Sequence, residues 1–427
     1  MAEPLLLRWQ GLLRPADLVL LRLEWLSGGV LVLLLTGLPL FTRGGLSLVI
    51  AAVALLWLLW SLCSPPEEIG AISGWLLLIL GIAVLTTGFS PVPMAAAKGL
   101  LKLLSYLSVY ALIRKLLACN PSWWDRLLAG LLSGGLLSSV LALRQLYAST
   151  EELARWADPN SISTGTIRIY GPLGNPNLLA GYLLPLLPLA AVALLRWKGI
   201  GSRLFAGTTL ILGVAATVWT YSRGGWIGML AGLATLMLLL ILRTTRHWPP
   251  IWRRLLPLAV LLLAAALLTV AATKLEPIRT RVASLLAGRG DSSNNFRINV
   301  WLAAIDMIQD RPWLGIGPGN AAFNSVYPLY QQPKFNALSA YSVPLELLVE
   351  MGLPGLIAGL GLLWSALQRG LRGLTLPQPA AGAALASLAA ITGLLTQGIT
   401  DTIFFRPEVQ LIGWFCLATL AAQPSEA

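Results

Sequence analysis

Apolar residues fill most of the chain in long runs, and short polar segments separate these runs. A helix needs roughly 20 mostly apolar residues to cross the hydrocarbon core of a bilayer. Twelve runs approach this length, at residues 24–41, 44–62, 70–88, 99–117, 127–146, 177–195, 203–221, 225–242, 254–272, 344–366, 380–400 and 408–422. We therefore predict an all-α polytopic membrane protein with about 12 transmembrane helices. The whole chain, 1–427, is expected to form a single membrane domain.

The composition agrees with a membrane protein and argues against a soluble one. Only 11% of the residues are charged and 56% are hydrophobic, whereas soluble domains carry about 25% charged residues. A net charge of +12 would favour nucleic-acid binding in a soluble protein. Here the basic residues lie between apolar runs, without the aromatic residues of a nucleic-acid surface. We expect the lipid bilayer as a partner and no nucleic acid.

The basic residues also predict the orientation of the chain, because cytoplasmic loops carry an excess of Lys and Arg. If the N-terminus is inside, the inner segments hold most of them: Arg8, Arg14, Arg22, Arg114, Lys115, Arg126, Arg196, Lys198, Arg203, Arg243, Arg246, Arg253, Arg254, Arg369 and Arg372. The short outer connections hold Arg43, Arg155, Arg168, Arg223 and Arg406. This bias predicts an even number of spans with both termini cytoplasmic. The first span is expected to act as its own insertion signal, without a cleaved signal peptide.

Two outer connections are long, at 147–176 and 273–343. The second contains residues 297–308, whose apolar positions 298, 301, 302, 305 and 308 share one helical face. We expect an amphipathic helix there, on the membrane or on the bundle, with N-caps available at 292–295. The glycine-rich segment Gly315–Asn320 that follows predicts a turn.

The outer side holds residues that could bind an anion. Arg223 lies in a tight link between two spans, and Arg297 opens the loop helix. Arg168 precedes Asn175 and Asn177, either of which could cap the sixth span, and a helix N-terminus favours an anion. Together these groups could converge on one anion. The alternatives are an arginine reaching lipid phosphates at 223, solvated charges at 168 and 297, and asparagines that only cap.

Acidic residues near the last spans have two interpretations each. Glu346 and Glu350 are four positions apart, so they share a helical face. They could pair with the arginines, relay protons, or form a structural pair. Asp401 and Arg406 flank the last outer turn and could pair with each other.

Motifs for cofactors and metals are missing. The chain has three cysteines and one histidine, His247, without metal-ligand spacing. It has no P-loop, no GxSxG elbow, no dinucleotide fingerprint and no HExxH. We expect neither a cofactor nor a metal site.

Four motifs occur in the order of a known family: Tyr170–Asn177, Ser222–Gly225, Arg297–Asn320 and Leu345–Leu356. Their order and spacing, over residues 165–366, resemble the O-antigen ligase/polymerase superfamily. The segment Leu338–Glu346 looks like the IctB-type cyanobacterial branch, whose members are described as bicarbonate transporters.

The resemblance implies a location in the bacterial inner membrane, with 273–343 as a large periplasmic loop. It implies that Arg223 and Arg297 hold the diphosphate of an undecaprenyl carrier, beside Arg168, Asn175 and Asn177. It also implies a histidine before the tenth span, where this chain has Tyr341. Tyrosine, with a pKa of about 10, is a poor base at neutral pH. The catalytic candidates are then Tyr341 and Glu346.

Three functions follow from this resemblance. The first is inorganic carbon transport, as a bicarbonate transporter or an accessory of one, in agreement with the missing histidine. The second is a glycosyltransferase that moves a glycan from an undecaprenyl diphosphate carrier to an acceptor on the periplasmic face. The third is a lipid-diphosphate or glycan binding protein without catalysis. In each case the arginines would hold an anionic substrate, either bicarbonate or a polyprenyl diphosphate glycan.

Overall fold

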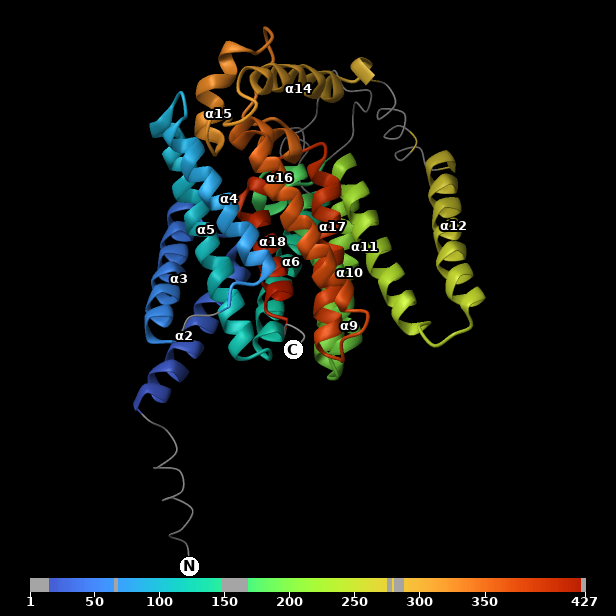
Figure 1. Cartoon of the computed structure of the whole chain (residues 1–427). Coiled ribbons are helices and arrows are strands. Elements are labelled where there is room, and N and C mark those ends of the chain that lie inside the picture. Colours follow the sequence, from blue (N-terminus) through green and yellow to red (C-terminus); the bar gives the residue numbers. More distant parts are fainter. Residues whose placement is uncertain (1–14, 65–67, 148–167, 275–278, 280–287, 424–427) are drawn as a thin grey trace, which may run out of the picture.

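The computed structural model describes residues 15–64, 68–147, 168–274, 279 and 288–423. Within these ranges the chain is helical and contains no strand. Long helices stand side by side, and the helices of the second long connection cover one end of the bundle (Figure 1). The predicted all-α membrane architecture is confirmed.

Every predicted apolar run coincides with helical structure. The bundle helices are α2 (Pro15–Gly37), α3 (Arg43–Cys63), α4 (Ala71–Gly88), α5 (Pro93–Cys119), α6 (Trp123–Arg144), α8 (Pro176–Leu183), α9 (Leu186–Arg196), α10 (Ile200–Trp219), α11 (Arg223–Thr244), α12 (Pro250–Lys274), α16 (Val343–Arg372), α17 (Ala380–Gly398) and α18 (Pro407–Ala421). Within the described ranges, 10 helical segments are long and apolar enough to cross a membrane. The other two runs correspond to α18, which has 15 residues, and to α12, at the edge of the bundle beside α11 (Figure 1).

The ends of the described chain agree with an even number of crossings. Helix α2 begins and α18 ends at the end of the bundle that faces away from α14 (Figure 1). The loop segments 148–167, 275–278 and 280–287 lie outside the described residues, as do Arg8, Arg14 and Arg155.

Two spans are interrupted inside the bundle. The sixth is split into α8 and α9 at Pro185, which is the N-cap of α9 and has no N–H to continue the helix. Helix α16 is broken at Gly352, whose φ of 63° is outside the helical region. Main-chain polar groups freed inside a membrane need partners in the protein. The carbonyls of Val349 and Glu350 accept from Ile316 and Gly317 at 2.9 Å each.

Further helices cover the end of the bundle that lies opposite the start of α2 and the end of α18 (Figure 1). They are α14 (Ser292–Asp310), α15 (Asn320–Val326) and the 3-10 turns η3 (Gly288–Gly290) and η4 (Tyr327–Leu329). Further 3-10 turns are η1 (Gln145–Tyr147), η2 (Gly171–Leu173) and η5 (Ile403–Phe405). The covering helices pack around Phe323 and Tyr327 in a small core of their own, which also includes Val349 of α16.

The predicted amphipathic helix is present as α14, and the face that packs on the rest of the protein is not the apolar face noted in the sequence. The buried apolar side chains are Val300, Ala303, Ala304 and Met307, whereas Leu302 of the predicted face is 47% exposed. Alanines lack bulky side chains, so this face can approach the bundle more closely than the face with larger residues. The N-cap is Asp291, one residue before the predicted segment 292–295.

Candidate functional site

The first residue of α11, Arg223, is tied to the N-terminus of α14. The side chain of Ser222 caps α11 by accepting from the Gly225 N–H at 3.3 Å. Arg223 Nη2 lies 3.1 Å from Asp291 Oδ1, and both side chains are buried. The same Asp291 oxygen accepts from the Asn294 N–H at 3.1 Å and caps α14. One carboxylate therefore holds both an arginine of the bundle and the loop helix.

The guanidinium of Arg297 is buried beside Asp401 and is incompletely paired. Its Nη1 donates to Ser293 Oγ at 3.1 Å, and its Nη2 lies 3.9 Å from Asp401 Oδ2. Among the residues that the structure describes, its buried Nε has no hydrogen-bond partner. Burial lowers the pKa of Arg297, Asp401 opposes this shift, and Arg223 adds to it. An unpaired donor on a buried cation is suited to accept an anionic oxygen.

The third arginine, Arg168, is held by hydrogen bonds to Thr220 and to Asn177 of α8. Its Nε donates to the Thr220 carbonyl at 2.9 Å, and its Nη2 donates to Asn177 Oδ1 at 2.7 Å. Asn175 is the cap of α8, because its side chain accepts from the N–H groups of Asn177 and Leu178. Asn175 thus shapes the helix start, while Asn177 orients the arginine.

Asp401 is close enough to Arg297 and Arg168 for both arginines to affect the pKa of its carboxyl group. Burial raises the pKa of its carboxyl, while Arg297, two backbone N–H groups and Arg168 lower it without cancelling the effect of burial. The predicted pair of Asp401 with Arg406 is wrong. Arg406 Nε instead lies 3.9 Å from Glu408 Oε2. In the chain, η5 lies between Asp401 and Arg406. We name Arg168, Arg223, Arg297, Asp291 and Asp401 the arginine cluster.

Tyr341 lies beside the arginine cluster in a restricted conformation. Its φ is 50°, which is uncommon for a residue with a side chain. Its ring meets Phe296 edge to face at 5.3 Å, and its carbonyl accepts from Trp301 Nε1 at 3.4 Å. Burial and the nearby Asp401 raise the pKa of Tyr341, and Arg297 lowers it by less. The phenol is therefore protonated at neutral pH, where it can donate a hydrogen bond but cannot serve as a base.

Glu346 and Glu350 form a buried pair behind the turn that carries Tyr341. Glu346 Oε2 accepts from the Ala340 N–H at 2.5 Å, and the two glutamates are hydrogen-bonded to each other. They share one helical face, as predicted. Among the described residues, the cation that acts electrostatically on both glutamates is Lys102 of α5.

Two participants were not identified from the sequence. Asp291 was not recognised as the partner of Arg223, although its position just before α14 is a cap signal that could have revealed it. Lys102 was hidden within an apolar run, where a single charge is itself a signal of a buried polar site.

The region that contains these residues has a recognisable family pattern. Residues 208–360 match the family described as O-Antigen ligase. The match covers about a third of the 427-residue chain and includes Arg223, Arg297 and Tyr341. It supports the O-antigen ligase superfamily and a ligase-like membrane protein. Three of the four motifs lie inside the matched range, and Tyr170–Asn177 lies outside it. A comparison with curated proteins finds no match.

The expectations about the cyanobacterial branch, bicarbonate transport and the roles of single residues go beyond this match. It does not extend to the cyanobacterial branch, and bicarbonate transport is not shown by it. The roles predicted for the individual arginines, asparagines, Tyr341 and Glu346 stay predictions.

Proposed function

We propose that this protein is a glycosyltransferase that moves a glycan from a polyprenyl diphosphate carrier to an acceptor hydroxyl at the outer face of the membrane. The observation that carries the proposal is the buried, incompletely paired guanidinium of Arg297, which lies beside Asp401 and near Arg223. The family match supports the same reaction class.

The charges of the arginine cluster favour a polyvalent anion. Within the described part of the chain, the cluster holds three arginines and two aspartates, so its positive charges outnumber its negative ones. Arginine presents a planar fork of donors that matches phosphate oxygens. A diphosphate would satisfy the free Nε of Arg297 and would compete with Asp291 for Arg223.

In the proposed reaction the acceptor oxygen bonds to the anomeric carbon of the glycan, and the bond from that carbon to the diphosphate oxygen breaks. The electron pair leaves with the diphosphate, where Arg223 and Arg297 stabilise the developing charge. The proton of the acceptor hydroxyl passes to Asp401, because its raised pKa makes it a better base than an ordinary carboxylate. Tyr341 donates a hydrogen bond to the reacting oxygens. Glu346 holds the turn of Tyr341 through the Ala340 N–H.

The first test measures binding of a fluorescent polyprenyl diphosphate glycan to the purified protein in nanodiscs. Arg297→Ala and Arg223→Ala each remove charged hydrogen bonds worth about 1.5–3 kcal/mol, so binding should weaken roughly 10- to 100-fold. Arg406→Ala is the control, because this arginine lies near the same face but is 53% exposed and paired with Glu408. Equal weakening in Arg406→Ala and Arg297→Ala would contradict the proposal.

Bicarbonate transport stays a prediction from the branch resemblance, and vesicles containing the protein test it. Labelled bicarbonate should enter such vesicles no faster than it enters empty ones, with or without a sodium or proton gradient. Uptake that Arg297→Ala abolishes would replace the transferase proposal with the transport function.

A further inference from the structure

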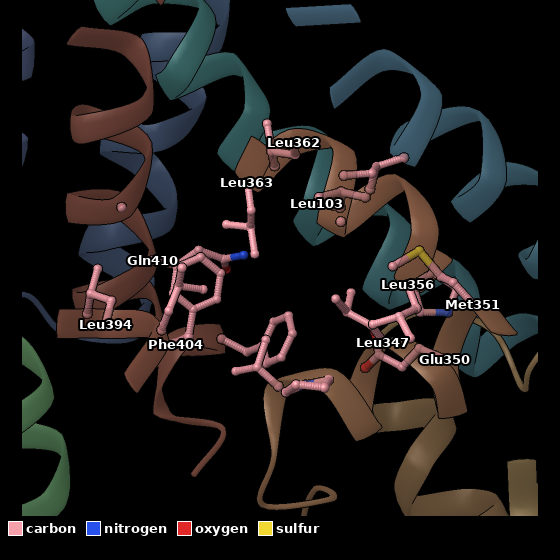
Figure 2. Close-up of a pocket in the computed structure, with 18 of the residues that line it drawn as sticks. Leu103, Leu347, Glu350, Met351, Leu356, Leu362, Leu363, Leu394, Phe404 and Gln410 are labelled. Atoms are coloured by element: carbon pink, nitrogen blue, oxygen red, sulfur yellow. The ribbon is translucent and has the colours of Figure 1, made fainter. Parts of the chain in front are cut away.

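A separate cavity of about 450 Å³ lies inside the bundle between α4, α5, α16, α17 and α18. Figure 2 shows Leu103, Leu347, Leu356 and Leu363 around this space. Its volume falls in the range of about 300–1,000 Å³ that is typical of small-molecule sites. The wall is mainly apolar, so the cavity is suited to an apolar chain.

Some residues that line the cavity are also exposed on the outside of the bundle. Leu360 of α16 and Ile399, which directly follows α17, both line it, and they are 56% and 59% exposed. Both residues belong to predicted spans, so their exposed surface lies among lipid chains. Residues of the arginine cluster and Tyr341 are not part of the lining. The cavity is therefore distinct from the proposed diphosphate site.

Polar groups interrupt the apolar wall. Glu350 and Gln410 are both among the lining residues (Figure 2) and are each 6% exposed. Lys102 also lines the cavity and donates from Nζ to the Phe405 carbonyl at 2.8 Å. Two carboxyl groups, of Glu346 and Glu350, lie near the single ammonium group of Lys102, so the lysine needs no further anion to balance it.

We propose that this cavity binds a neutral lipid, with an acyl chain between the leucines and an uncharged hydroxyl head at Glu350 and Lys102. A hydroxyl both donates and accepts, so it can satisfy a carboxylate and an ammonium group together. An anionic head would be opposed by the glutamate pair, because an unpaired charge in a buried site is unfavourable. This inference concerns binding alone and does not depend on the proposed transfer reaction.

Photolabelling in nanodiscs tests the proposal with a diacylglycerol that carries a diazirine on one acyl chain. Labelled peptides are expected to come from the cavity-lining parts of α16 and α17. Leu360→Trp should block the mouth and cause loss of most of this labelling. Ile357→Trp is the matched control, because Ile357 is 60% exposed on the same helix but does not line the cavity. Unchanged labelling in Leu360→Trp, or equal loss in the two variants, would overturn the proposal.

A second probe tests the chemistry of the head group. A phosphatidic acid analogue with the same chains and diazirine should label the cavity less than the diacylglycerol does. Glu350→Gln removes negative charge beside Lys102, so labelling by the anionic probe should rise in this variant. Equal labelling of the unaltered protein by the two probes would refute a neutral-head site. A thermal melt of each variant confirms that it is folded before labelling is compared.

Discussion

Asp401 is the residue whose ionisation most directly affects the arginine cluster. Its folded pKa is above the ordinary value of 3.8, so the folded protein takes up this proton at a higher pH than the unfolded chain does. The contribution of this group to stability therefore rises as the pH falls through the folded pKa. The same protonation releases Arg297 from its carboxylate partner.

Asp401→Asn imitates the protonated carboxyl and should separate binding from transfer. We expect carrier binding at least as tight as in the unaltered protein, because the amide does not compete as an anion for Arg297. Transfer should fall by roughly 100-fold or more, since general bases contribute about 10²–10⁴-fold. Binding measured from pH 4 to 7 should tighten toward acid in the unaltered protein more than in the variant. Full transfer activity in the variant would exclude Asp401 as the base.

Tyr341 offers a milder test of the same site. Tyr341→Phe keeps the ring contact with Phe296 but removes the phenolic donor. The loss of one hydrogen bond, about 0.5–1.5 kcal/mol, should slow transfer roughly two- to tenfold. The shape of the pH–rate profile should stay the same, because the phenol is not the base. A lost basic limb in the rate profile would show that Tyr341 itself titrates during the reaction.

Among the helices, α16 is broken at Gly352, and the break connects this helix to the segment after α14. Gly352 has φ 63°, and a Cβ at this position would lie 2.4 Å from the Trp313 carbonyl oxygen. The next residue, Leu353, donates its N–H to the Pro312 carbonyl at 2.8 Å. The interruption thus joins the spanning helix to the segment after α14.

Gly352→Ala should destabilise the protein because it combines a disfavoured φ with a main-chain clash. We expect a loss of at least about 1 kcal/mol, seen as a lower melting temperature in detergent and faster proteolysis of the outer segment. Gly81→Ala in α4 is the control, because a Cβ there meets nothing within 4 Å. Equal melting temperatures for the two variants would show that the break is not required.

Across the whole molecule, the buried pair of Arg223 and Asp291 joins the bundle to the covering helices. Removing one partner of a buried pair costs about 3–5 kcal/mol, because the other charge stays behind. Asp291→Ala should therefore raise hydrogen exchange at the start of α14. Asp291→Asn retains a good helix cap and should raise it less. If exchange in α14 is the same in both variants and in the unaltered protein, the pair does not hold the covering helices.

The spanning helices could be predicted because bilayer thickness sets a length that apolar runs display directly. The candidate arginines Arg168, Arg223 and Arg297 could be found in the sequence because few charged residues lie beside the spans on that side. The partner of Asp401 could not be found, because Arg406 is near in sequence while Arg297 is near only in the fold. The contact face of α14 was also hidden, since this helix has apolar residues on two sides and only packing selects one.

The shared carboxylate of Asp291 has one further consequence. It accepts from both Arg223 and the first turn of α14, so a diphosphate that draws Arg223 away also changes the cap of that helix. Carrier affinity and the docking of α14 would then be thermodynamically linked, and the linkage must act equally in both directions. A ligand that clamps α14 against the bundle would thus alter the proposed carrier affinity without touching the arginines.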